Sequence, residues 1–227
     1  YGQLVYEDTT NCGFYLLLDI LRLKGITDVT TVDDLKRILL REYFKYYQTN
    51  KSQLADIIIE GGKKTLGQQL KAETLSLLHF IMTDSFFITN FDIWLIMQAF
   101  EIPCILISTF HFLETSYQKN VFITYGDVDS DFVFILSPGF KNQPDHIPSY
   151  KIIQGLHDNI FIPLSEIKEE CRETITTALE NKITIENFIT TQYPNYKKTT
   201  LETPTQKQTL KKNSKNKNSG EFFGGVG

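Results

Sequence analysis

The hydrophobic pattern of the chain changes its period near residue 103, and this change constrains the fold more than any other feature of the sequence. Before it, apolar residues recur at spacings of three and four, as in Cys12–Leu23, where Leu17 and Leu21 fall on one helical face. After it, short β-branched and aromatic runs are separated by Gly, Pro and Asp. We therefore predict a segregated α+β fold, in which a helical N-terminal part packs on a small central sheet.

The pattern also predicts where the elements lie. We expect helices over residues 12–23, 33–47, 53–60, 66–80, 92–100 and 165–187. We expect strands over residues 104–109, 121–125, 132–136, 150–153 and 159–162. Thr10 or Asn11 can cap the first helix, and Gly25 follows its end.

The charge distribution divides the chain into a body and a tail. Residues 195–227 contain seven lysines and two glutamates, a balance of +5, so the net charge of −4 leaves −9 on residues 1–194. The tail has almost no apolar content and cannot bury enough surface to offset its ordering entropy, so we expect it to be disordered. The acidic body favours a basic partner surface, and the tail offers only weak, non-specific affinity for nucleic acid.

Two short segments, 145 residues apart, carry the residue types of a thiol protease. Cys12 stands where an apolar helix begins, and His157 stands far downstream in His157-Asp158-Asn159. A thiolate at a helix N-terminus is stabilised by the helix dipole, and an imidazole can take its proton and later protonate the leaving amine. We therefore predict Cys12 as the nucleophile and His157 as the base.

The remaining members of the catalytic group are less constrained. Asn159 shares a strand face with His157 by the period of two, so it can orient the ring, and Asp8 is a second candidate for that role. His111 is an alternative base, whereas His146 is expected in an exposed loop. Backbone N–H groups around Thr9 to Cys12 are expected to hold the oxyanion.

The number and spacing of the cysteines indicate the redox compartment of the protein and whether it has a metal site. Cys12, Cys104 and Cys171 form an odd, sparse set, which argues for a reducing compartment and against a disulfide framework. Cys104 lies in an apolar run and is expected to be buried. No Cys/His cluster has zinc spacing and no apolar stretch is long enough to cross a bilayer, so we expect no metal, no cofactor and no membrane contact.

Three ordered segments resemble the ovarian-tumour (OTU) family of deubiquitinating cysteine proteases over roughly residues 1–165. Asn11-Cys12-Gly13-Phe14 matches the second half of that family's Asp-Gly-Asn-Cys-x-Phe segment. Residues 86–94 and 105–107 resemble its middle helix and strand, and His157-Asp158-Asn159 matches its closing His-aromatic-Asn/Asp at two positions. Asp8 stands four residues before Cys12, where the family has Asp three residues before.

The resemblance implies an OTU-like, papain-type cysteine protease domain over residues 1–194. It implies cleavage of isopeptide bonds of ubiquitin or a ubiquitin-like protein by a monomeric enzyme with Cys12, His157 and Asn159. The altered Asp8-Thr9-Thr10 loop favours an alternative, a weak or inactive ubiquitin-binding module of the same fold. A third hypothesis, a nucleic-acid-associated scaffold, rests on the lysine-rich tail alone. The departures suit a remote member such as a viral one, which implies the cytoplasm of a host cell.

Overall fold

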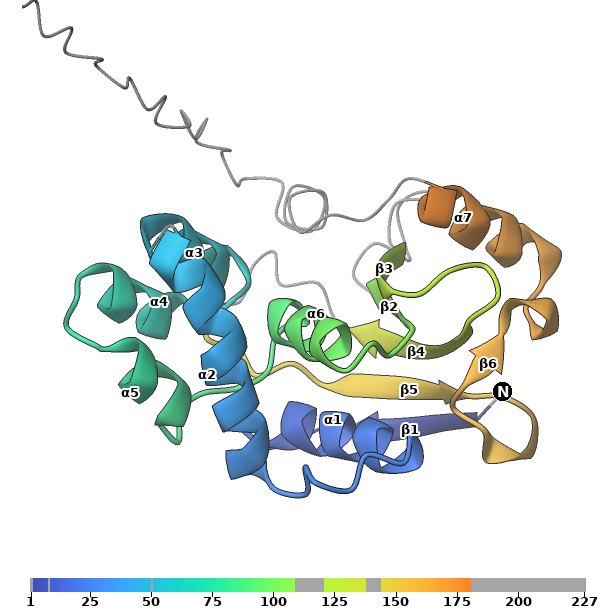
Figure 1. The fold of residues 1–227 in the computed structure, drawn as a ribbon, viewed down its shortest axis with the longest axis horizontal. Coiled ribbons are helices and arrows are strands. Elements are labelled where there is room, and N and C mark those ends of the chain that lie inside the picture. Colours follow the sequence, from blue (N-terminus) through green and yellow to red (C-terminus); the bar gives the residue numbers. More distant parts are fainter. Residues whose placement is uncertain (1, 8, 50, 109–120, 138–143, 181–227) are drawn as a thin grey trace, which may run out of the picture. The chain divides into compact units, whose positions relative to one another are not determined.

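The protein combines a group of helices with a small mixed sheet, which confirms the α+β class (Figure 1). The computed structural model describes residues 2–7, 9–49, 51–108, 121–137 and 144–180. The helices are α1 Cys12–Leu23, α2 Val32–Thr49, α3 Lys51–Glu60, α4 Lys64–Lys71, α5 Leu77–Met82, α6 Asn90–Ala99 and α7 Glu169–Glu180, with 3-10 turns at Leu156–Asp158 and Leu164–Glu166. The strands are β1 Gly2–Tyr6, β2 Cys104–Ser108, β3 Val121–Tyr125, β4 Asp131–Ser137, β5 Tyr150–Gln154 and β6 Ile162–Pro163.

The predicted helix over residues 66–80 is two helices, α4 and α5, with a turn between them. Glu73 in this turn has a φ of 59°, a left-handed conformation that ends a helix. Ser76 then caps α5, because its side chain accepts a hydrogen bond from the backbone N–H of His79. The apolar spacing continues through the turn, which is why periodicity alone does not reveal the break.

The sheet has the strand order β1-β5-β4-β2-β3, with β6 paired to β4. β2 and β4 are parallel, and the other pairs are antiparallel. The sequence pattern missed β1, which is five residues long and mostly exposed. The strand predicted over residues 159–162 is wrong except at its end, since β6 begins at Ile162.

The two faces of the sheet are covered by different helices. In β4, Val133 and Ile135 face the core built by α1 to α6, while Phe132 and Phe134 join Ile175 of α7 on the other face. Alternate residues of a strand point to opposite faces, so β4 serves both layers. Figure 1 shows α2 to α5 gathered at one end of this unit and α7 at the opposite end.

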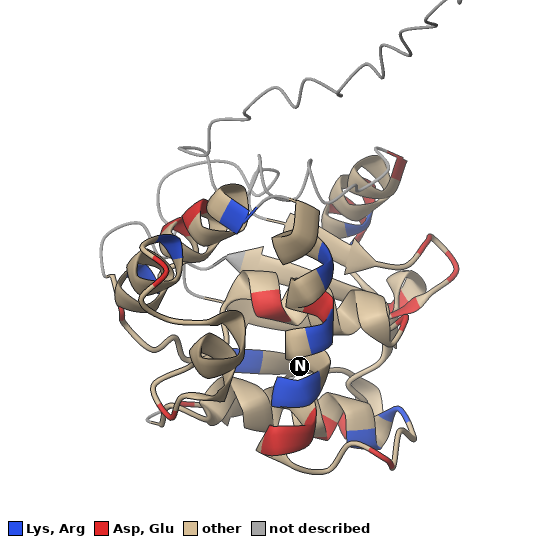
Figure 2. Cartoon of the chain, turned by 60° about the vertical axis from the view of Figure 1, so that its left-hand side comes forward, with Lys and Arg blue, Asp and Glu red and all other residues tan. Residues whose placement is uncertain are grey.

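The described elements belong to one compact unit that spans Tyr1–Lys197. The predicted disordered tail lies outside the described residues, so its disorder stays a prediction. None of the helices in the described part of the chain combines the length and apolar character that a bilayer crossing requires. In Figure 2, which brings α2 to α5 forward, acidic and basic positions lie interspersed over these helices.

Candidate active site

Cys12 is the first residue of α1 and lies in the core with 3% of its surface exposed. Its neighbour Gly13 touches Ile88 so closely that a Cβ at Gly13 would lie 2.5 Å from the Cβ of Ile88. Only glycine fits there without displacing the segment that leads into α6. The N-terminus of α1 has no side-chain cap, because the side chain of Asn11 at the N-cap makes no hydrogen bond to it, contrary to the expectation.

Both polar groups of Cys12 have acceptors in this structure. The thiol Sγ donates to the carbonyl oxygen of Pro148 at 3.1 Å, and the backbone N–H donates to the carbonyl of Thr9 at 3.1 Å. Pro148 lies two residues before β5, so the contact joins the start of α1 to the start of β5. The backbone N–H of Cys12, an expected oxyanion donor, therefore already donates to a carbonyl within the turn before α1.

The segment that carries Pro148 also carries His146, and its first residues are fixed to α4. The carboxylate of Asp145 accepts hydrogen bonds from the Thr65 backbone N–H at 3.0 Å and from the Thr65 hydroxyl at 2.6 Å. The backbone N–H of Asp145 donates to the carbonyl of Gly62 at 2.8 Å. An aspartate suits this place because a carboxylate is favoured at a helix N-terminus. His146 thereby lies between Asp145, which is anchored to α4, and Pro148, whose carbonyl accepts from the Cys12 thiol.

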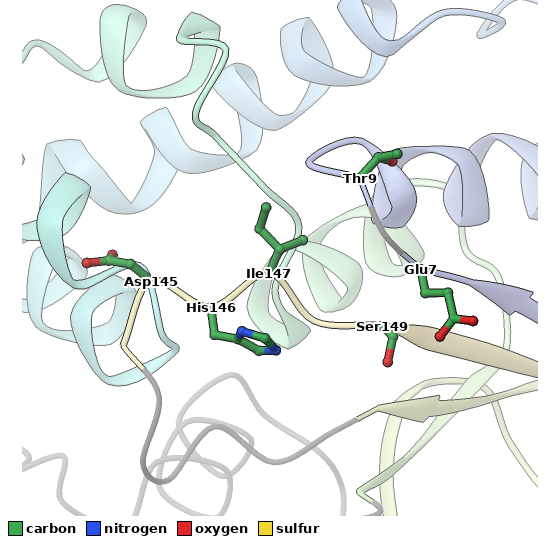
Figure 3. A pocket seen from close by; sticks show the side chains of 6 residues that line it. All are labelled: Glu7, Thr9, Asp145, His146, Ile147 and Ser149. Carbon is green, nitrogen blue, oxygen red and sulfur yellow. The ribbon is translucent and has the colours of Figure 1, made fainter.

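A mostly polar pocket opens beside this segment (Figure 3). It is lined by Glu7, Thr9, Asp145, His146, Ile147 and Ser149. Figure 3 shows the side chains of His146 and Ser149 pointing to the same side of the chain, with Ile147 on the other side. Since Thr9 shares the pocket and bonds to Cys12, His146 lies near the start of α1. The expectation of an exposed loop histidine is confirmed, but its place near the start of α1 was not foreseen.

The structure does not bring His157 to Cys12. In the antiparallel pair β1–β5, Tyr6 lies opposite Tyr150 and Gly2 lies opposite Gln154. Cys12 follows the Tyr6 end, whereas His157 follows Gln154, and four strand residues separate these ends by roughly 13 Å. All four histidines follow Cys12 in the sequence, and between His146 and His157 the strand register places His146 nearer to Cys12.

Asn159 does not orient His157 either. The segment around His157 is a 3-10 turn, not a strand, and His157 has a φ of 56° and Asp158 a φ of 60°. The side chain of Asn159 donates to the carbonyl of Phe161 at 2.7 Å and accepts from the Phe161 N–H at 3.1 Å. The period-two argument that placed Asn159 beside the ring fails because it assumed an extended backbone.

The other candidates fall into two groups. Asp8 and His111 lie outside the described residues. Cys104 is fully buried, as expected, and burial raises the pKa of its thiol to about 12. Cys171 is exposed on α7. Within the described ranges, no group of three or more His, Cys, Asp or Glu side chains could hold a metal ion.

A buried ion pair supports the site, and sequence reasoning missed its cation. Lys63 Nζ lies 2.5 Å from Asp92 Oδ2, and the two side chains are 1% and 0% exposed. The same carboxylate accepts from the backbone N–H of Thr89 at 2.6 Å and from the Tyr43 hydroxyl at 2.5 Å. The Lys63 ammonium also lies 3.8 Å from the ring centre of Phe86. Burial lowers the pKa of Lys63, and the Asp92 charge opposes this shift.

Both partners of this ion pair lie near residues that contact the candidate site. Lys63 directly follows Gly62, whose carbonyl holds Asp145. Asp92 belongs to α6, whose lead-in residue Ile88 packs on Gly13. The sequence gives a local signal for the anion alone, since Thr89 and Asp92 have the spacing of a capping box.

The comparisons with known proteins give no relative. No family model matches the chain, and neither the curated proteins nor the solved structures contain a significant match to it. The functional assignment therefore depends on the geometry described above and on the sequence resemblance to the OTU family.

Proposed function

We propose that this protein is a thiol-dependent hydrolase of peptide or isopeptide bonds, with Cys12 as the nucleophile and His146 as the base. Sγ of Cys12 attacks the substrate carbonyl while His146 takes the thiol proton. His146 then returns that proton to the amine as the C–N bond breaks, and water hydrolyses the thioester. The N-terminal dipole of α1 favours the thiolate that this step needs.

The observation that carries the proposal is the contact of the Cys12 thiol with the carbonyl of Pro148. It fixes the nucleophile against the segment that holds His146, only two residues away along the chain. Two consecutive trans peptides span at most about 7 Å, so a side-chain rotation and a small backbone shift suffice to pair the ring with the thiol. His157 has no comparable route to Cys12.

The resemblance extends the proposal to an OTU-like fold and to ubiquitin or a ubiquitin-like protein as the substrate. The order β1-β5-β4, with the cysteine helix after β1 and the histidine before β5, is compatible with such a fold. The charge of −9 on residues 1–194 suits a substrate that enters by a basic C-terminal tail.

One observation favours the second candidate function, an inactive ubiquitin-binding module of the same fold. Cys12 is 3% exposed, and its thiol and backbone N–H both have internal acceptors. An active enzyme must therefore release the thiol from Pro148 when the substrate binds. The binding module needs no such rearrangement.

A ubiquitin that carries a C-terminal electrophile separates the two functions. An enzyme forms a covalent adduct, and mass spectrometry locates it on Cys12 rather than on Cys171. The matched variants are His146→Ala, which abolishes adduct formation and turnover, and His157→Ala, which leaves both unchanged. Binding of ubiquitin with no adduct would support the binding module, and loss of activity in His157→Ala alone would refute our choice of base.

A further inference from the structure

Asn90, the first residue of α6, carries a buried hydrogen-bond donor that no described residue accepts. The side chain is 1% exposed, and no acceptor among the described residues lies within hydrogen-bond distance of its Nδ2. Oδ1 accepts a hydrogen bond from the hydroxyl of Ser137 at 2.5 Å, a distance that fits an O–H donor and is too short for an amide N–H donor. This distance assigns the amide orientation, and it leaves Nδ2 without an acceptor in the described part of the chain. An unmet buried donor is costly, so such a group needs an explanation, and a catalytic role is one.

Two contacts place Asn90 at the same edge of the sheet as the nucleophile. Ile88, two residues before Asn90, packs on Gly13, the residue after Cys12. The carbonyl of Ile88 also accepts a hydrogen bond from the Tyr150 hydroxyl at 2.8 Å. Tyr150 begins β5, next to the segment that carries Pro148 and His146.

The sheet register gives the same placement. Leu136 of β4 lies opposite Lys151 of β5, so Ser137 lies beside Tyr150, on the face that the helices α1 to α6 cover. Asn90 is attached to Ser137 at this edge. The start of β5 therefore lies between the strand that leads to Cys12 and the strand end that holds Asn90.

A tetrahedral intermediate at Cys12 needs a hydrogen-bond donor for its oxyanion, and one expected donor is already engaged. The backbone N–H of Cys12 is bonded to the Thr9 carbonyl. We propose that Nδ2 of Asn90 donates a hydrogen bond to the oxyanion that forms when Cys12 attacks, which makes Asn90 a catalytic residue. This inference rests on the proposed function.

The step balances without any group beyond substrate and protein. The Sγ–C bond forms, and the carbonyl π electrons move onto oxygen, which becomes the oxyanion held by Nδ2. The thiol proton resides on His146. When the carbonyl re-forms, the C–N bond breaks and the amine leaves with that proton.

The test compares Asn90→Leu, a replacement of similar size without the amide donors, with the unchanged chain in three assays. In hydrolysis of ubiquitin with a C-terminal fluorogenic amide, kcat falls by about 100- to 1,000-fold with little change in KM. Inhibition by ubiquitin aldehyde, whose hemithioacetal oxygen takes the place of the oxyanion, weakens by a similar factor. Alkylation of Cys12 by iodoacetamide keeps its rate and pH profile, because that displacement forms no oxyanion.

The outcomes separate this inference from the proposed function. If the unchanged chain reacts with neither ubiquitin probe, the proposed function fails and the inference fails with it. If the unchanged chain is active and Asn90→Leu keeps kcat within about threefold, only the inference fails. An equal loss in iodoacetamide alkylation also overturns it, since that result assigns Asn90 to holding the thiol or His146.

Ser137→Ala serves as a second variant. It keeps both amide hydrogens of Asn90 but removes the bond that orients them, so kcat falls by a smaller factor, about tenfold, and alkylation stays unchanged. If Asn90→Leu does not fold, as judged by its thermal midpoint, this variant decides the question in the same assays. A Ser137→Ala chain with unchanged kcat would then overturn the inference.

Discussion

Replacement of Lys63 by Met tests whether the buried ion pair holds the helical layer together. The substitution Lys63→Met keeps most of the apolar stem near Phe86 but removes the cation that lies 2.5 Å from Asp92. The carboxylate then stays buried with its hydrogen bonds from Thr89 and Tyr43 and with no opposing charge.

The expected loss follows from this burial. Removing one partner of a buried ion pair costs about 3–5 kcal/mol, because the remaining charge has lost its compensation. For a domain of this size, each kcal/mol lowers the midpoint of thermal unfolding by roughly 2–4 °C, so the shift amounts to roughly 6–20 °C. Met conserves volume, so cavity formation adds little to this figure.

Urea unfolding followed by circular dichroism measures the change in the free energy of unfolding. The matched control is Lys64→Met at the exposed neighbouring position, which we expect to stay within about 0.5 kcal/mol of the unchanged chain. In the double variant Lys63→Met/Asp92→Asn, the amide keeps an acceptor for Tyr43 and carries no charge, so more than half of the loss is recovered. A Lys63→Met chain as stable as the Lys64→Met control would refute the reasoning.

Three further results follow from the described contacts. Because burial raises the pKa of Cys104 to about 12, this thiol resists alkylation at pH 8 in the folded chain, whereas exposed Cys171 reacts, as mass mapping can establish. The stability that the buried Cys104 thiol contributes is present below its ordinary pKa of 9.0 and declines as the pH rises above that value, which pH-dependent unfolding measures. Thr65→Val removes the 2.6 Å hydrogen bond to Asp145 and lowers turnover by up to about tenfold, while Thr65→Ser does not, and equal rates for both would contradict the anchoring role. Asn159→Ala costs about 1 kcal/mol of stability for its lost backbone bonds but leaves turnover unchanged; a fall in kcat would return Asn159 to the catalytic group.

Local pattern was a sufficient guide to most of the elements. The residues of α1 and β3 were predicted to the residue, because their hydrophobic periods and flanking turn residues agree. The class of fold followed from the change of period near residue 103. The local pattern did not predict the break at Glu73, because the apolar spacing continues across this turn.

The position of each histidine relative to Cys12 could not be predicted, for a different reason. His146 and His157 both follow Cys12 in sequence, and only the pairing of β1 with β5 decides which one comes near it. β1 was missed because a short, exposed strand shows little alternation, and register between distant strands is not encoded locally. Lys63 was missed likewise, since a buried lysine is recognised only by its partner 29 residues on.

The contact between Cys12 and Pro148 spans 136 positions of the chain, and this separation has a consequence for synthesis. A ribosome completes α1 long before β5 emerges, and non-local strand pairing must wait for the later segment. Until then, Cys12 lacks its contact with Pro148 and β1 has no neighbour in the sheet. The nascent polypeptide therefore carries Cys12 without its contact to the Pro148 segment, and activity of the proposed site begins only after β5 has been translated and paired with β1.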